Sequence, residues 1–422
     1  MTTSATTSHQ ATIQWNELGS IVPAGDIAEA SVADAIDGVV PGRVVRPNSV
    51  EQISQLLKWA SETGVKVAPR GSGSKLGWGN MPAGVDLVLS LEKMTGVVEH
   101  VWEDMTVTVR AGNTIAQLQA ELGKHRQSLA LDPLWPERAT VGGVIAANDS
   151  GSRRIRCGSI RDLILGATVV LANGTVARSG GKVVKNVAGY DLPKLMTGSF
   201  GTLGVIAEAT FRLYPVASVT RTVTFKASDI ASANGFVLAV ADSTLVPTGL
   251  QIRVQAESAV VNVRFEGLQE GIDAQVAQAR QLADGAALVE GSEEVWRRES
   301  LFSGGTPAVV GKFSVLPTRI AETVKVIQSR FPRARMTVQS TGIGLFRGEC
   351  DSAAKLAELV AALRKDARSL GGSLVFLDLP SEVKKTLDVF GAPCDSHPLM
   401  IRVKQRFDPM GTLNPGRFLG GI

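Results

Sequence analysis

The chain has 422 residues, 44% hydrophobic and 20% charged, which allows two or three domains with buried cores and excludes an intrinsically disordered protein. Its 44 Lys and Arg exceed its 40 Asp and Glu by only four charges, and short basic runs such as residues 296–298 and 333–335 are too small for a nucleic-acid groove. The three cysteines, Cys157, Cys350 and Cys394, form no CxxC pair. This spacing excludes a disulfide framework or a cysteine-ligated metal cluster and favours a reducing compartment.

The amino terminus and the glycine content give two further indications. Residues 1–10 are rich in Ser and Thr and lack the basic and apolar regions of a signal peptide, and no run of roughly 18 apolar residues occurs. We therefore expect a cytoplasmic protein that touches a membrane only through partners, at the inner face. Glycine accounts for 44 of the 422 residues, above the usual share of about 7%, so the places where glycines cluster are informative.

The first half of the chain predicts mixed α/β structure. Ser49 and Gln52 begin a helix over residues 50–63, whose apolar residues recur every three to four positions, and Gly64 ends it. Strands are expected at 44–46, 65–69, 86–90 and 107–110, and a helix at 114–122. Residues 140–206 contain glycine-rich turns between apolar stretches such as 163–171 and 205–211, which indicates a loop-rich region built around a ligand.

Beyond residue 215 the pattern changes. Strands are predicted at 220–225, 250–255, 260–265 and 373–379, with helices at 271–283, 319–330 and 353–370. Such an order favours an antiparallel sheet covered by helices, an α+β domain. We therefore expect an N-terminal segment 1–40, a first domain 41–216, a second domain 217–390, and a C-terminal segment 391–422 that returns to the first domain.

Three glycine-rich segments carry the chemistry. Residues 70–75, Arg-Gly-Ser-Gly-Ser-Lys, follow a strand, and their backbone N–H groups can converge on a phosphate. Taken alone, an ordinary glycine turn is an equal alternative, because the spacing is not GxGxxG and no regular helix is expected to follow. The other segments, 132–162 and 180–206, combine glycines with neutral hydrogen-bonding side chains. Three such segments suit a long, buried ligand that carries a diphosphate.

The order of four motifs resembles a known family. Pro69-Arg-Gly-Ser-Gly-Ser, Ala139-Thr-Val-Gly-Gly-Val-Ile-Ala-Ala-Asn, Gly201-Thr-Leu-Gly-Val-Ile and Phe407-Asp-Pro-Met-Gly-Thr-Leu-Asn-Pro-Gly are similar to FAD-dependent flavoproteins of the vanillyl-alcohol-oxidase or PCMH type. The stretch Gly180–Leu192 is similar to the FAD-binding subunits E of glycolate oxidases (glycolate dehydrogenases). The resemblance, from about residue 43 to the C-terminus, implies an α+β fold: a PCMH-type FAD-binding domain of two α/β subdomains and an α+β cap domain with an antiparallel sheet.

The resemblance also implies the residues that hold FAD. Residues 70–76 would bind the pyrophosphate, a second group would line the ribityl chain and flavin, and Asn414 would close over the flavin unless its Asn-Pro-Gly is an ordinary turn. The full implied set is Pro69, Arg70, Gly71, Ser72, Gly73, Ser74, Lys75, Leu76, Asp132, Pro133, Thr140, Gly142, Gly143, Asn148, Gly151, Gly158, Ser159, Gly204, Val205, Ile206 and Asn414. Ser74 stands where relatives with a covalent flavin carry His, so the resemblance implies noncovalent FAD.

Departures from the family leave the catalytic residues open. Phe200 occupies a position that is Glu in many relatives. None of the four histidines, His9, His100, His125 and His397, forms the pair that a metal-assisted 2-hydroxy-acid site needs, so we expect no metal.

Two side chains are candidates for chemistry at the substrate. His397 is a candidate base near the flavin, or a packing residue, and Lys312 is a candidate carboxylate ligand, or a solvated lysine. Trp78, Trp135 and Tyr190 either flank the ring system or belong to a core. Cys157 is either near the cofactor or a buried thiol.

Three functions follow as hypotheses. The first is an FAD-binding subunit of a complex that oxidises glycolate, a small 2-hydroxy acid, to glyoxylate. In that complex a sibling FAD-linked subunit oxidises the 2-hydroxy acid and an iron–sulfur subunit takes the electrons. The second is a self-sufficient FAD-dependent dehydrogenase of 2-hydroxy or sugar acids. The third is a structural flavoprotein subunit without chemistry of its own.

Overall fold

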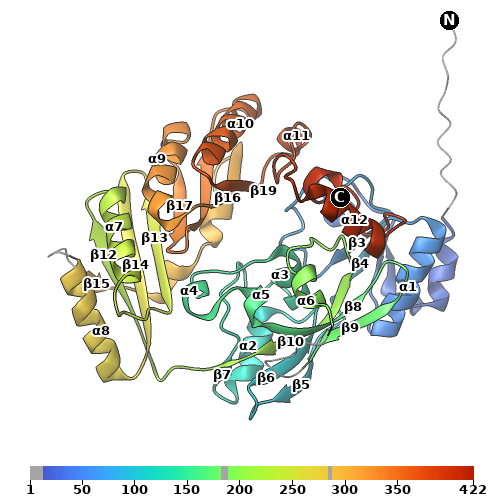
Figure 1. Ribbon diagram of the computed structural model, residues 1–422. Helices are drawn as coiled ribbons and strands as arrows, with labels where there is room; N and C mark the ends of the chain where they lie inside the picture. Colours follow the sequence, from blue (N-terminus) through green and yellow to red (C-terminus); the bar gives the residue numbers. More distant parts are fainter. Residues whose placement is uncertain (1–12, 182–188, 284–287) are drawn as a thin grey trace, which may run out of the picture.

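The computed structural model describes residues 13–181, 189–283 and 288–422. The polypeptide forms two bodies that lie side by side (Figure 1), each around its own large apolar core. The first body contains the N-terminal half and the C-terminal segment, and the second contains the eight-stranded sheet. Residues 182–188 of the distinctive Gly180–Leu192 stretch lie outside the described residues.

A four-stranded sheet begins the first body. Its strand order is β1 (Ile27–Glu29), β2 (Arg43–Val45), β4 (Leu87–Ser90) and β3 (Val67–Arg70), with β2 and β3 parallel to β4. Helix α1 (Val50–Thr63) has the predicted bounds. The Ser49 hydroxyl accepts a hydrogen bond from Gln52 N, and Gly64 adopts the left-handed conformation that ends the helix. The helix buries Ile53 and its apolar neighbours, so the predicted periodicity is confirmed.

The second sheet of this body is antiparallel. Its order is β5 (Val97–Val101), β6 (Thr106–Arg110), β10 (Val205–Arg212), β8 (Ile164–Val170) and β9 (Val176–Gly180), and a small pair joins β7 (Gln127–Ser128) to β11 (Tyr214–Pro215). The helices are α2 (Ile115–Gly123), α3 (Val141–Ala147), α4 (Arg154–Cys157), α5 (Ile160–Leu163) and α6 (Leu192–Met196).

The prediction of mere turns around residues 142–143 was wrong, because these glycines lie inside α3. Thr140 caps α3, and a Cβ at Gly142 would come 3.0 Å from that of Ala111. The two glycines therefore allow close packing of this helix.

The second body is one antiparallel sheet covered on one face by helices. Its strand order is β15 (Leu288–Glu290), β12 (Val219–Ala227), β14 (Ser258–Gly267), β13 (Gly249–Gln255), β17 (Arg335–Gln339), β18 (Ile343–Glu349), β16 (Ala308–Ser314) and β19 (Ser373–Asp378). The helices are α7 (Ile230–Ala241), α8 (Gln269–Leu282), α9 (Ile320–Arg330), α10 (Ala353–Ser369) and α11 (Ser381–Lys384). The predicted α+β architecture is confirmed. Helix α7 was not predicted, since its sequence is apolar over most of its circumference.

The opposite face of this sheet is polar and looks toward the first body (Figure 1). Along β13, Leu250 and Ile252 belong to the apolar core, whereas Gln251 points to the other side. On the neighbouring strand the amide of Gln339 donates to the carbonyl of Ser150 in the first body. The second body therefore presents hydrogen-bonding side chains where the two bodies meet.

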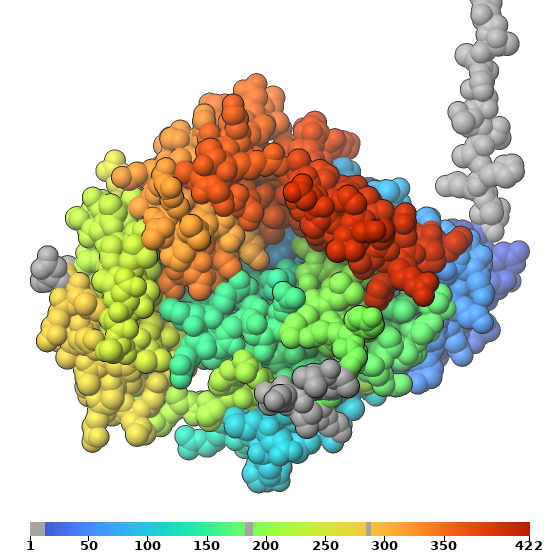
Figure 2. Space-filling view, in the orientation of Figure 1, coloured from blue at the N-terminus to red at the C-terminus, as the bar shows by residue number. Residues whose placement is uncertain are grey.

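The C-terminal segment lies on the first body. Helix α12 (His397–Phe407) leads into residues 408–417, where Val67 N donates to Thr412 O over 2.8 Å and Asn414 N donates to Val67 O over 2.9 Å. Figure 2 shows this segment, in red, between the N-terminal elements and the second body. In the part of the chain that is described, no helix is long and apolar enough to cross a membrane.

Candidate functional site

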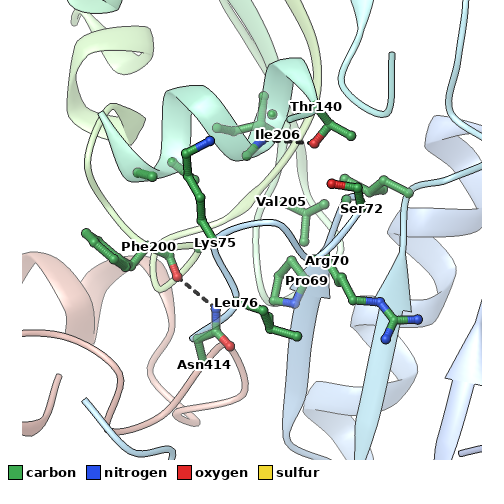
Figure 3. Close-up of a pocket in the computed structure, with 18 of the residues that line it drawn as sticks. Pro69, Arg70, Ser72, Lys75, Leu76, Thr140, Phe200, Val205, Ile206 and Asn414 are labelled. Carbon is green, nitrogen blue, oxygen red and sulfur yellow. Dashed lines mark hydrogen bonds between the residues drawn. The ribbon is translucent and has the colours of Figure 1, made fainter. Parts of the chain in front are cut away.

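A pocket opens where the loop after β3 meets α3, the turn before β10 and the C-terminal segment (Figure 3). Phe200 and Asn414 lie at one side of it, and Ser72 and Thr140 at the other. The lining consists of residues 69–76, Leu91, Thr140, Gly142, Gly143, Ala146, Ala147, Phe200, Gly201, residues 204–206, Asn414 and Arg417. Most of this surface is glycine backbone and small side chains, which lets a ligand approach the main chain.

Two glycines of the pocket have no room for a side chain. A Cβ at Gly71 would lie 2.1 Å from Thr140 Oγ1. A Cβ at Gly201, which has a φ of +69°, would lie 3.0 Å from Asn414 Nδ2. Both positions bring the main chain of one segment against the side chain of another, so the pocket depends on these glycines.

Asn414 leaves one buried acceptor at the pocket. Its Nδ2 donates to Phe200 O over 2.7 Å, while its Oδ1 is buried without a partner among the described residues. An unpaired buried amide oxygen is costly unless a ligand or water donates to it. A ligand with its own hydrogen-bond donors therefore fits this end of the pocket.

Comparisons with known proteins agree with this geometry. Residues 41–180 match the protein-family model described as "FAD binding domain". The solved structure titled p-cresol methylhydroxylase with substrate bound covers 95% of this chain and 95% of its own, with a TM-score of 0.75 and 14% identity. An alkyldihydroxyacetonephosphate synthase structure covers 95% and 84%, with a TM-score of 0.73 and 17% identity. The fold is therefore the PCMH-type FAD-binding fold.

Curated relatives define the class further. "Glycolate oxidase subunit GlcD" of Bacillus subtilis is 27% identical over 90% of this chain and 89% of that protein. "D-lactate dehydrogenase" of Archaeoglobus fulgidus is 42% identical, over 41% of this chain and 38% of that protein. "Glycolate oxidase subunit GlcE" of Escherichia coli is 35% identical, over 39% of this chain and 46% of that protein. With the matching domain, these similarities make the chain an FAD-dependent oxidoreductase. When bound, FAD supplies an acceptor for two electrons.

The pocket brings together most of the residues expected to hold FAD. Its lining includes residues 69–76, Thr140, Gly142, Gly143, residues 204–206 and Asn414. The remaining members of the expected set, Asp132, Pro133, Asn148, Gly151, Gly158 and Ser159, are not part of this lining.

Those six residues lie in the segments next to the pocket, where they hold loops and helix ends in place. The Asp132 carboxylate accepts hydrogen bonds from Gly151 N and Ser152 N over 3.1 and 2.8 Å, and Pro133 beside it is buried. Asn148 ends α3 in the left-handed conformation. The backbone and hydroxyl of Ser159, after Gly158, donate to the Asp162 carboxylate.

Sequence reasoning missed several residues of the lining: Leu91, Ala146, Ala147, Phe200, Gly201 and Arg417. Two of them had a usable signal. Ala146 and Ala147 stand four residues after Gly142 and Gly143, so the four small residues share one side of a helix. Arg417 had none, because its role depends on a distant loop: its guanidinium donates to the carbonyls of Leu76, Trp78 and Asn80.

Residues 70–76, which we call the cradle, are expected to hold the phosphates of FAD, and replacing Gly71 with alanine tests this expectation. We expect Gly71→Ala to weaken FAD binding by at least about tenfold, since the new methyl group must displace Thr140. Gly77→Ala in the same loop is the matched control, because a Cβ at Gly77 meets nothing within 4 Å and its φ is ordinary. The dissociation constant of FAD is measured by quenching of flavin fluorescence. Equal affinities of the two variants would contradict this account of the pocket.

A cationic cluster lies beside the pocket, around Asp149. Lys75, which lines the pocket, places Nζ 3.1 Å from Asp149 Oδ2. Arg298, Lys312 and Lys75 all stabilise the charged form of Asp149, whose pKa is lowered despite its burial. Arg298 also donates to the carbonyls of Asp132 and Ser150. Four cations, with Arg154 as the fourth, therefore surround one buried carboxylate.

Two of these cations are not fully paired. Lys312, on β16, has no hydrogen bond or ion pair among the described residues. Burial, with a smaller contribution from the positive charges of Arg154 and Arg298, lowers the pKa of Lys312 to about 8. Arg154 Nε is buried without a hydrogen-bond partner among the described residues. Excess positive charge that is held away from water favours an anionic ligand.

The other expected chemistry-bearing residues lie elsewhere. His397 begins α12, with Nε2 3.3 Å from Leu419 O, and it is not part of the pocket lining. Tyr190 is almost fully exposed, and Cys157 is buried, with a pKa raised chiefly by desolvation. Trp78 and Trp135 pack against the second body rather than line the pocket. Within the described ranges, no three His, Cys, Asp or Glu side chains converge to hold a metal ion.

Proposed function

We propose that this chain oxidises a small 2-hydroxy acid such as glycolate, as the FAD-binding subunit of a glycolate oxidase complex. The observation that carries the proposal is the incompletely paired cationic cluster of Lys312 and Arg154 beside the FAD pocket. A 2-hydroxy acid has a carboxylate next to the carbon that is oxidised. A cationic site that binds this carboxylate would hold the reacting carbon close to the cofactor.

The relatives support the substrate class. They include glycolate oxidase subunits, D-lactate dehydrogenases and a D-2-hydroxyglutarate dehydrogenase, and the acids in these names share a 2-hydroxy-acid group. The words "subunit GlcD" and "subunit GlcE" support a complex, with a sibling FAD-linked subunit. We further propose that an iron–sulfur subunit accepts the electrons and that any membrane contact is made by partners. FAD is held noncovalently in this proposal, because Ser74 has no imidazole to which the flavin could be attached.

Each proposed role follows from a contact. Residues 70–74 and the glycines of α3 would hold the cofactor through main-chain groups, and Asn414 Oδ1 would accept a donor from it. The Lys312 ammonium and the Arg154 guanidinium would bind the substrate carboxylate. Asp149 would keep Lys75 and Lys312 in place by its charge. The eight-stranded sheet of the second body, which we call the cap, would exclude water from the substrate. Exclusion of water strengthens these charge interactions.

The cluster favours a substrate site on this chain over a purely structural role. We would co-express the chain with its partners and record the flavin absorbance of the chain alone and of the complex before and after adding glycolate. Loss of flavin absorbance in the isolated chain supports the proposal and makes the chain self-sufficient. Loss in the complex alone would instead assign substrate oxidation to the sibling subunit and make this chain an electron carrier. Bound flavin that never responds to any 2-hydroxy acid would refute the proposal and leave the structural role.

Substrate affinity should depend on pH through Lys312. This lysine is charged below its pKa of about 8, so binding of the substrate anion is complete below that pH and weakens as the pH rises through it. We expect KM to increase above pH 8, by up to about tenfold per pH unit, until Arg154 alone binds the carboxylate. Initial rates between pH 7 and 10 measure this effect. A flat KM over this range would argue against Lys312 as a substrate ligand.

A further inference from the structure

The FAD cradle, residues 70–76, is held by both bodies through Lys75. Lys75 has a side chain only 6% exposed, and besides Asp149 its Nζ contacts the carbonyl of Leu134 at 3.3 Å. The same ammonium lies 5.7 Å from the ring centre of Trp78 and 5.6 Å from that of Trp135. A carboxylate, a carbonyl and two aromatic rings therefore form a cage around one cation.

Residues of the second body complete this cage from outside. Phe302 stacks on Trp78 with ring centres 6.1 Å apart and meets Trp135 edge to face at 4.7 Å. Trp135 N donates to Glu299 Oε1 over 3.1 Å. Glu299 and Phe302 belong to one short 3-10 helix, and neither lines the FAD pocket. The cap thus fixes the rings that hold Lys75.

The caged residue belongs to the cradle itself. Lys75 follows Ser74 directly, and residues 70–76 all line the pocket. Because Lys75 is buried, moving its ammonium would leave Asp149 buried without this partner, so the loop is held to one position. A change in cap packing that displaces Trp78 or Trp135 would therefore also displace the cradle.

We propose that Lys75 is a positioning residue that couples packing of the cap to FAD binding, through the cage of Asp149, Trp78 and Trp135 that Phe302 closes. The inference requires only that FAD occupies the pocket and is independent of the substrate. It predicts that a cap residue outside the pocket controls cofactor affinity. By reciprocity, bound FAD stabilises the contact between the two bodies.

The test is a double-mutant cycle on FAD affinity. Lys75→Met and Phe302→Leu are each expected to raise the dissociation constant of FAD by about tenfold, and the double variant by much less than a hundredfold, because both changes disrupt one cage. Lys75→Arg, which keeps the charge over the rings, should stay closer to the unchanged protein than Lys75→Met. Quenching of flavin fluorescence measures the dissociation constant of FAD for the unchanged protein and for each variant, without any substrate.

The control separates the cage from general loss of cap packing. Phe236→Leu removes similar apolar volume from the cap, where Phe236 of α7 packs on Phe225 of β12, and it should leave FAD affinity unchanged. Unchanged affinity in Phe302→Leu, or strictly multiplicative effects in the double variant, would overturn the proposal. If Lys75→Met does not fold, Phe302→Leu against Phe236→Leu still decides it. Because substrate is absent, the result does not depend on the proposed reaction.

Discussion

Lys312→Met is expected to lower kcat/KM for a 2-hydroxy acid by about 100-fold while the protein keeps its full content of FAD. The variant removes a cation from a dry site in which the substrate carboxylate would otherwise have a charged partner, and truncating one partner of such a pair costs about 2–5 kcal/mol. Lys312 is not part of the lining of the pocket that is proposed to hold FAD, so the cofactor should remain bound. The measurement is the rate of flavin reduction by glycolate and by D-lactate in the purified complex.

The matched control is a lysine of the same body that faces solvent. Lys325→Met, in α9, changes the same charge at an exposed position and should leave the rate unchanged. The KM of Lys312→Met should also lose its rise above pH 8, which a merely structural lysine would not explain. An unchanged kcat/KM in this variant, with normal FAD content, would remove Lys312 from the substrate site.

Asp37→Asn is expected to lower the free energy of unfolding by about 3–5 kcal/mol. Asp37 accepts from Lys384 Nζ at 2.9 Å and from Arg417 Nη1 at 3.0 Å, and the two cationic side chains are 2% and 4% exposed. Lys384 belongs to α11 of the cap, whereas Arg417 belongs to the C-terminal segment. Removing the shared carboxylate takes away the ion-pair partner of both buried cations, and the pKa of Lys384 is already lowered by desolvation.

Denaturation by urea, followed by tryptophan fluorescence, measures this effect. Glu121→Gln removes the partner of Lys124 in an exposed ion pair, and it should not shift the unfolding midpoint measurably. A midpoint for Asp37→Asn that is indistinguishable from the control would show that the triad does not hold the cap to the C-terminal segment.

Local signals in the sequence were sufficient for many elements. The helix over residues 50–63 was predicted with its cap and its terminal glycine, because both signals depend only on neighbouring residues. Four strands and three helices of the cap were predicted within a few residues for the same reason, whereas β15, β17 and β18 were not predicted. By contrast, α3 was taken for turns, since two adjacent glycines disfavour a helix unless tertiary packing requires them.

The sequence by itself indicated a phosphate-binding loop at residues 70–76 only as one of two equal alternatives, because an ordinary turn has the same glycines and serines, and the order of the four motifs supplied the resemblance to FAD-binding proteins. Only the tertiary structure decided which charges meet. Asp149 and Lys312 are far apart in the chain, as are Lys75 and Phe302, and no local pattern reports their proximity. Electrostatic interactions and ring contacts act over a few ångströms in space regardless of chain distance, so these sites exist only once the two bodies have packed.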